Sequence, residues 1–145
     1  MNIGFTGTQE GTTPNQFASF CKLVRALSAL DADNVFHNGD CIGADEETAI
    51  FVHTQGWKIH LHPPLNNGKR AFLDKIATWV SPRLQYLDRN KNIVNESNIL
   101  IATPSGPEKL RSGTWSTVRY AIAKQKRTYI IYPDGNIVVK NYQLP

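Results

Sequence analysis

The 145-residue chain contains little sulfur, with two cysteines and one methionine. Two cysteines are too few for the disulfide framework of a small secreted domain. No apolar run approaches the length that crosses a bilayer, and the chain has no long block of one charge and no low-complexity segment. These absences exclude disulfide-stapled, membrane-spanning and disordered proteins, so we expect one globular domain over residues 1–145.

The first residues read as a strand and lack the charged segment and apolar core of a signal peptide. We therefore expect a cytoplasmic protein whose Cys21 and Cys41 stay reduced. The net charge is +4 and the sequence pI is about 9.2, with the positive charges dispersed along the chain. This mild basic bias is compatible with a phosphate-bearing ligand and does not require nucleic acid.

Strand-like and helix-like segments alternate along the whole sequence, with no internal repeat. Such alternation is typical of an α/β sandwich around a mostly parallel sheet. The turn residues 133–135 predict a strand at 136–140 that returns antiparallel at the sheet edge. The other expected strands are 2–6, 34–37, 57–61, 98–102 and 128–132, and the expected helices follow Thr13 and cover 44–55, 69–80, 88–96 and 114–125.

The segment from Arg111 to Thr117 lies between a strand-like apolar run and an amphipathic helix. At such a helix start, unpaired backbone N–H groups and the helix dipole attract an anion, and Gly113 allows a phosphate to approach the backbone. The alternative is an ordinary capped helix whose hydroxyl groups bond only their own backbone. The hydroxyl groups in question belong to Ser112, Thr114, Ser116 and Thr117.

Three loops with similar chemistry follow strands of the expected sheet. In a parallel sheet these loops share one edge, and ligands bind there where the strand order reverses. Each loop combines glycine with side chains that bond a sugar or a phosphate, although the dinucleotide motif G-x-G-x-x-G is absent. The candidate residues are Thr6, Gly7, Thr8 and Gln9 in the first loop, Asn38, Gly39, Asp40, Gly43 and Asp45 in the second, and Ser112, Gly113, Thr114, Trp115, Ser116 and Thr117 in the third.

Four segments of the chain form an ordered set of motifs. Residues 5–8 look like a G-x-R/T loop, residues 37–45 like S-G-G-A-x-G-I-D, residues 86–94 like F-P-x-R-N-R-x-I-A, and residues 111–121 like K/R-S-G-S-L-I-T-A-R-x-A. In this order they resemble the DprA/Smf family, part of a superfamily that also contains the LOG phosphoribohydrolases. The chain is similar to a stand-alone minimal member, which implies a Rossmann-like three-layer sandwich and a ligand that contains a nucleotide.

The resemblance leaves three functions open, because ligands of the superfamily include nucleotide-derived signals, nucleoside monophosphates and single-stranded DNA. The leading interpretation is a receptor or sequestering protein that binds a nucleotide or nucleotide-derived signal at the carboxyl edge of the sheet. One alternative is a LOG-type nucleotide N-glycosidase, with Arg89 similar to the family's arginine but Ser116 and Thr117 in place of its glutamate. The other is a minimal single-stranded DNA binder, although Ile42 stands where a basic residue is expected.

Single residues have specific expected roles. Arg89 and Asn90, which match the third motif, are suited to gripping a phosphate. Asp40 would accept a ribose hydroxyl or act as a base. Asp45 would favour the dipole of its helix or, in the hydrolase, handle the sugar or water. Trp115 would either stack on a base or pack beneath its loop.

His60 and His62 alternate along a strand and therefore face one side of the sheet. They are suited to a metal, but the sequence offers no third ligand nearby, so we expect neither a metal site nor a cofactor. We expect Trp57, Phe72 and Trp79 in the core. The expected partner is a nucleotide or nucleotide-derived small molecule, with single-stranded DNA as the alternative, no membrane, and a homo-oligomer compatible with the expected edge strand.

Overall fold

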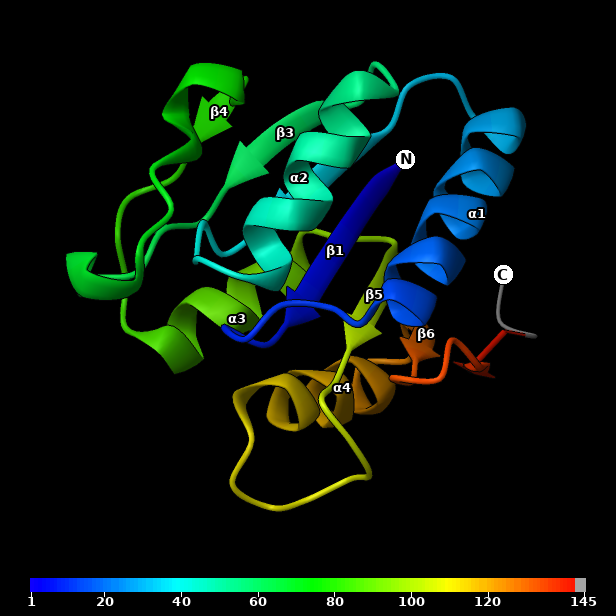
Figure 1. Cartoon of the computed structure of the whole chain (residues 1–145). Helices are drawn as coiled ribbons and strands as arrows, with labels where there is room; N and C mark the ends of the chain where they lie inside the picture. The colour runs from blue at the N-terminus through cyan, green and yellow to red at the C-terminus, as the bar shows by residue number, and fades with distance from the viewer. Residues whose placement is uncertain (143–145) are drawn as a thin grey trace.

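The computed structural model describes residues 1–142. These residues form a single seven-stranded sheet with helices on both of its faces (Figure 1). The strands are β1 (Asn2–Gly7), β2 (Val35–Asn38), β3 (Lys58–Leu61), β4 (Trp79–Val80), β5 (Ile99–Thr103), β6 (Arg127–Ile131) and β7 (Ile137–Lys140). The α-helices are α1 (Pro14–Leu30), α2 (Ala44–Thr54), α3 (Tyr86–Asn95) and α4 (Gly113–Ala123), and the short 3-10 helices are η1 (Asn67–Lys69) and η2 (Leu73–Ile76).

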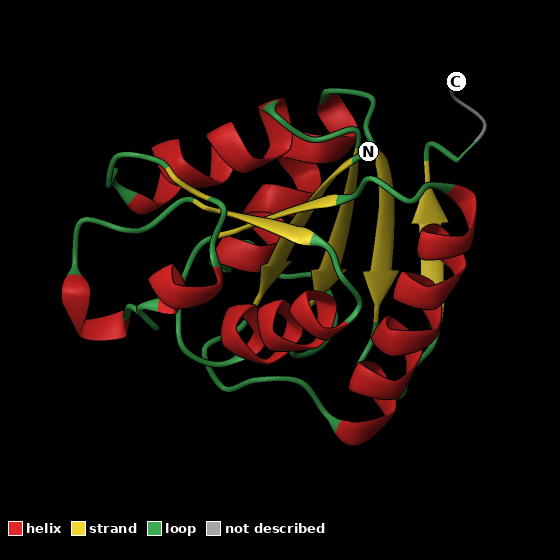
Figure 2. Ribbon diagram, turned by 90° about the horizontal axis from the view of Figure 1, so that it is seen from above, coloured by secondary structure: helices red, strands yellow, loops and turns green. Residues whose placement is uncertain are grey.

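The strand order is β4-β3-β2-β1-β5-β6-β7, and every neighbouring pair is parallel except β6 and β7. Figure 2 shows the edge strand β7 pointing opposite to its neighbour β6. The expected fold class, with a mostly parallel sheet and an antiparallel edge pair at the carboxyl end, is confirmed. The chain order runs outward from β1 in both directions, so the order reverses between β1 and β5.

The core is divided between the two faces of the sheet. On one face α1 and α2 cover an apolar cluster, and on the other α3 and α4 cover a smaller one. Alternate residues of the buried strands face opposite sides, so neighbouring Leu100 and Ile101 belong to different clusters. No helix within residues 1–142 combines the length and apolarity that a membrane crossing requires.

Helix α1 begins where the sequence predicts. The Thr13 hydroxyl accepts a hydrogen bond from the Gln16 N–H at 3.0 Å, and the Thr13 N–H donates to the Gln16 side chain at 3.2 Å. The Gln16 amide group also donates to the backbone carbonyls of Pro104 and Ile131, at 2.8 and 2.7 Å. This capping box therefore holds the start of α1 against the carboxyl ends of β5 and β6.

The helix expected at residues 69–80 is wrong. The backbone N–H groups of Ala71 and Leu73 donate to the Asp40 carbonyl at 2.8 Å and to its carboxylate at 2.9 Å, instead of to a preceding turn. Phe72 lies between them in the left-handed region, with φ of 59°, which an α-helix does not allow. Asp40, in the loop after β2, therefore accepts from N–H groups that would donate to the preceding turn in an α-helix.

The end of the same segment joins the sheet as β4, which pairs with β3. Trp57 is buried as expected, but Phe72 and Trp79 are 54% and 46% exposed, so their expected core positions are wrong. Both belong to the segment that does not form the expected helix. The single-domain expectation for 1–145 stays a prediction, and residues 143–145 lie outside the described part of the chain.

Candidate functional site

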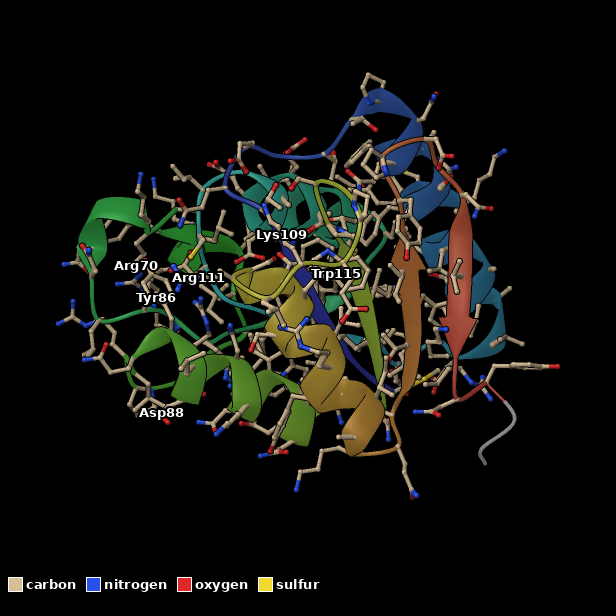
Figure 3. The ribbon with its side chains drawn as sticks, turned by 90° about the horizontal axis from the view of Figure 1, so that it is seen from below. Arg70, Tyr86, Asp88, Lys109, Arg111 and Trp115 are labelled. Carbon is tan, nitrogen blue, oxygen red and sulfur yellow. The ribbon has the colours of Figure 1, made fainter. Side chains whose placement is uncertain are left out.

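A cavity of about 490 Å³ opens at the carboxyl ends of the central strands. Its walls come from the loops after β1 and β2, the first turns of α3, and the segment from the end of β5 to the start of α4. Figure 3 shows Lys109 and Arg111 on the loop before α4 and Tyr86 at the start of α3. The cavity lies where the strand order reverses, which is where open α/β sheets bind ligands, and its volume suits a small molecule.

The three loops expected to converge all contribute to this cavity. Expected residues that line it are Thr6, Gly7, Thr8, Gln9, Gly39, Asp45, Arg89, Asn90, Ser112, Gly113 and Thr114. Expected residues outside its lining are Asn38, Asp40, Gly43, Trp115, Ser116 and Thr117. The sequence interpretation did not include the lining residues Phe5, Glu10, Cys41, Ile42, Tyr86, Leu87, Ile93, Ser105, Lys109 and Arg111 among its site residues.

The start of α4 provides backbone donors to the cavity. Ser112 caps the helix: its hydroxyl accepts from the Trp115 N–H at 3.2 Å and its carbonyl from the Ser116 N–H at 2.8 Å. Within the described chain no acceptor is found for the N–H groups of Gly113 and Thr114, and both residues line the cavity. These two N–H groups, at the positive end of the helix dipole, remain available to an anion.

Arg89 lines the cavity and links the loop after β2 to helix α3. It is 95% buried, and its Nη1 donates to the Gly39 carbonyl at 2.6 Å and to the His62 carbonyl at 3.2 Å. Its Nε donates to the Asn90 side chain at 2.7 Å. A Cβ at residue 39 would overlap Nη1, so glycine is required where the guanidinium lies on the backbone. Nε and Nη1 bond oxygen acceptors, whereas Nη2 has only the Cys41 sulfur at 3.9 Å, so Nη2 is the part of Arg89 suited to a ligand.

Asp45 and Cys41 are two titratable groups that interact with Arg89. Burial raises the pKa of Asp45 to about 6, although the Arg89 guanidinium opposes this change, and its carboxylate accepts from the Cys41 N–H at 3.2 Å. Burial, reinforced by the Asp45 charge, raises the pKa of the Cys41 thiol to about 11. Cys41 therefore remains a neutral thiol at neutral pH, which does not suit a nucleophile.

Asp40 and Asn38 have structural partners rather than positions on the cavity. Both are fully buried. The Asp40 carboxylate accepts from Arg70 Nε at 2.6 Å and from the Leu73 N–H, and the Asn38 side chain accepts from the Asp40 N–H at 2.8 Å. The carboxylate considered for a ribose hydroxyl is thus occupied in holding residues 70–73 against the sheet.

Gly43 allows the first two loops to touch. Its φ is 88°, and a Cβ there would overlap the Gln9 carbonyl oxygen. The Thr8 carbonyl accepts from the Ala44 N–H at 3.0 Å, which joins the loop after β1 to the start of α2. Gly43 therefore shapes the cavity without lining it.

Trp115 packs beneath its loop, with only 4% exposure and its ring 6.1 Å from that of Tyr132. Ser116 and Thr117 line a separate cavity of about 80 Å³. The Thr117 hydroxyl donates to the Gly113 carbonyl at 2.8 Å, as an ordinary helix hydroxyl does. The larger cavity is lined by the rings of Phe5 and Tyr86. Phe5 is buried, whereas Tyr86 is 36% exposed and has the Arg89 guanidinium 5.2 Å from its ring centroid.

The sequence matches no protein-family model and no curated protein. The fold is similar to that of solved structures, among them the following two. The structural genomics target TM1055 is 16% identical, with a TM-score of 0.64 over 88% of this chain and 71% of its own. The molybdenum cofactor binding protein of the phototrophic bacterium Rippkaea orientalis is 22% identical, with a TM-score of 0.66 over 90% of this chain and 76% of its own. The described chain therefore has the Rossmann-like α/β fold that these two proteins share.

Proposed function

We propose that the protein binds a nucleotide or nucleotide-derived signal in this cavity, as a receptor or sequestering protein. The observation that carries the proposal is the pair of N–H groups at Gly113 and Thr114, which have no acceptor in the described chain and open onto a cavity of about 490 Å³. Lys109 and Arg111 add positive charge to the same wall. A phosphate fits this combination of helix terminus and cationic side chains.

The other wall of the cavity suits a base. Tyr86 presents an aromatic ring, and Ile42 and Leu87 supply apolar surface beside it. A base stacked there would leave its phosphate to the start of α4, because the two walls belong to one cavity. We assign no residue to the ribose, since the Asp40 carboxylate is occupied by Arg70 and Leu73.

The order of the four motifs supports membership of the superfamily that contains the DprA/Smf proteins and the LOG enzymes. The similar protein from Rippkaea orientalis is named for binding a small molecule, the molybdenum cofactor. The second consideration favours a small-molecule ligand, whereas the superfamily of the first also contains proteins that bind single-stranded DNA. Neither identifies it, so the proposal rests on the chemistry of the cavity walls.

Hydrolysis of a nucleotide N-glycosidic bond is the second candidate, and Asp45 is the observation that favours it. It is a buried carboxyl group that lines the cavity, and its pKa is raised to about 6, which suits a general acid or base near neutral pH. Against this role, its carboxylate already accepts from the Cys41 N–H. Binding by a receptor or sequestering protein requires only the phosphate-binding start of α4 and the aromatic wall at Tyr86, and no catalytic group.

Thermal denaturation with AMP, GMP, CMP and UMP, alongside their nucleosides, tests the proposal. We expect at least one monophosphate to raise the melting temperature, its nucleoside to raise it less, and no free base to appear on chromatography. Release of base that Asp45→Asn abolishes would assign the hydrolase instead. Tighter binding of a single-stranded oligonucleotide, with a steep salt dependence, would assign DNA. No stabilisation by any of the four monophosphates would contradict the proposal.

A further inference from the structure

We propose that His37, His60, His62 and Glu96 form a binding site for one zinc ion. The site lies on the sheet face that α3 partly covers, and its residues come from β2, from β3 and the position after it, and from the end of α3. Each residue offers one nitrogen or oxygen ligand atom, and these four atoms lie within 4.8 Å of one another. The sequence places only His60 and His62 together, and the sheet brings the other two to them.

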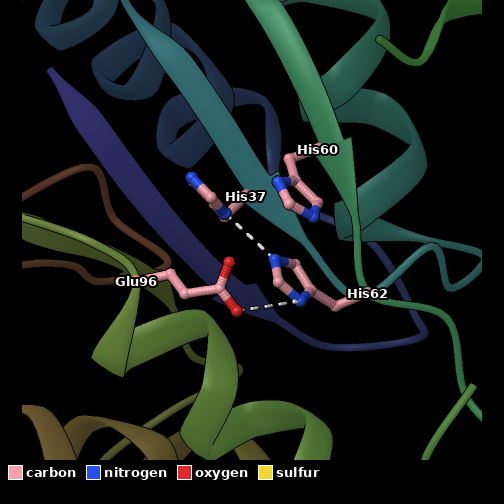
Figure 4. A group of neighbouring side chains, drawn as sticks. All are labelled: His37, His60, His62 and Glu96. Atoms are coloured by element: carbon pink, nitrogen blue, oxygen red, sulfur yellow. Dashed lines mark hydrogen bonds and ion pairs between the residues drawn. The ribbon is translucent and has the colours of Figure 1, made fainter. Parts of the chain in front are cut away.

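The histidine rings are in direct contact (Figure 4). His37 Nδ1 and His62 Nε2 are 2.9 Å apart, and His62 Nδ1 is 4.0 Å from the Glu96 carboxylate. The rings of His60 and His62 stack with centroids 4.5 Å apart, and those of His37 and His60 with centroids 4.8 Å apart. Parallel pairing of β2 with β3, in which His37 faces His60, sets this arrangement.

A hydrogen bond outside the cluster orients the innermost ring. His37 Nε2 lies 2.9 Å from the side-chain oxygen of Asn2, which can only accept. Nε2 must therefore carry the ring proton, and the Nδ1 lone pair points toward His62. An oxygen acceptor behind a histidine is how proteins orient a metal-binding imidazole.

The cluster is also electrically suited to a dication. Neutral imidazole is the form that binds metal, and Glu96 contributes a negative charge. Three imidazole nitrogens and one carboxylate oxygen, without sulfur, favour Zn²⁺ over the harder Mg²⁺ and Ca²⁺.

Tetrahedral zinc requires the four ligand atoms to close in. Bond lengths of about 2.0–2.1 Å place neighbouring ligand atoms about 3.3 Å apart. The largest present separation is at most 4.8 Å, so the required movement is about 1.5 Å. His60 and Glu96 have the most room to move: His60 is partly buried, with Nε2 2.7 Å from the Ser81 hydroxyl, and the Glu96 side chain is 44% exposed. His37 and His62 are already fixed by burial.

Calorimetric titration of the EDTA-treated, dialysed protein with ZnCl₂ tests the site. We expect one zinc ion per chain and a higher melting temperature with zinc. His60→Asn and Glu96→Gln should each weaken binding at least about tenfold, because loss of even an outer partner of a metal ligand costs that much. His53→Asn is the matched control: His53 is the remaining histidine, is exposed on α2 and lies outside the cluster.

Two further measurements separate a metal site from a merely structural network. Asn2→Ala should leave the fold intact, since only the exposed side chain is removed, and weaken zinc binding about tenfold. Co²⁺ in place of zinc should show the visible bands of a tetrahedral nitrogen and oxygen site. Absence of zinc binding, equal loss in His53→Asn, or a sulfur-to-cobalt band from Cys21 or Cys41 would overturn the proposal.

Discussion

Gly113→Asp places a carboxylate where we propose that the phosphate binds. Gly113 lines the cavity at the first turn of α4. Two unit charges about 5 Å apart repel by about 3 kcal/mol at an effective dielectric constant of 20, and by half that if solvent doubles the constant. The dissociation constant of a bound monophosphate should therefore rise roughly 15- to 200-fold.

The same substitution should not harm the fold. A Cβ at residue 113 meets no atom within 4 Å, and an acidic residue in the first turn of a helix stabilises it by about 0.3–1 kcal/mol. Stability and affinity are thus expected to change in opposite directions. This opposition distinguishes a blocked phosphate site from general damage to the protein.

Isothermal titration calorimetry with AMP, GMP, CMP and UMP measures the effect. Gly106→Asp is the matched control, because residue 106 lies in the same loop, has open space for a Cβ and does not line the cavity. It adds the same charge and should retain most of the affinity. Unchanged affinity in a folded Gly113→Asp variant, or an equal loss in Gly106→Asp, would exclude a phosphate bound at the start of α4.

Further predictions concern the base wall, the buried carboxyl group and a loop glycine. Tyr86→Ala should weaken nucleotide binding by about 1–3 kcal/mol in calorimetry while Tyr86→Phe keeps it, and equal losses would exclude stacking. Burial raises the pKa of Asp45 from 3.8 to about 6. The protonated carboxyl group therefore stabilises the folded state fully below about pH 4, and this stabilisation is lost as the pH rises through 6. In urea denaturation the free energy of unfolding of Asp45→Asn, relative to the wild type, should thus rise by up to about 3 kcal/mol from pH 4 to 7, and a flat difference would contradict the burial argument. Gly43→Ala should destabilise by more than about 3 kcal/mol, since φ is positive and the Cβ would overlap backbone, whereas Gly56→Ala, with positive φ but open space, should lose about 1–2 kcal/mol. Similar losses in both variants would show that the loop contact is unimportant.

Local signals were sufficient for most of the fold. The helix start at Thr13 and the turn at 133–135 are each determined by residues close in sequence, and each appears in the structure. The segment 69–80 differs because its partners are distant. Asp40 takes the backbone donors of residues 71 and 73, and nothing within the segment indicates this.

The candidate site shows the same division between local and distant causes. Strand order and loop chemistry predict which edge carries the cavity, because carboxyl ends of parallel strands meet there. Side-chain direction is not predictable in this way. Asp40 and Trp115 lie in the expected loops, yet one is held by Arg70 and the other packs in the core. The nearness of Tyr86 to those loops depends on how α3 packs.

The histidine cluster has no signal in sequence spacing beyond its first pair. His37 lies on a different strand from His60, and Glu96 follows a helix on the covering layer. Only the parallel register of β2 and β3 brings the two strands' histidines into contact. The pattern at 60 and 62 would have supported a metal site if this register had been known.

Amide chemical-shift mapping of the 16.2 kDa protein during titration with AMP, GMP, CMP and UMP shows whether the start of α4 holds the phosphate. A phosphate held by the start of α4 should move the Gly113 and Thr114 amide resonances more than any others, and the nucleoside without its phosphate should not. Binding that leaves these two resonances in place, or no response to any of the four monophosphates, would contradict the account.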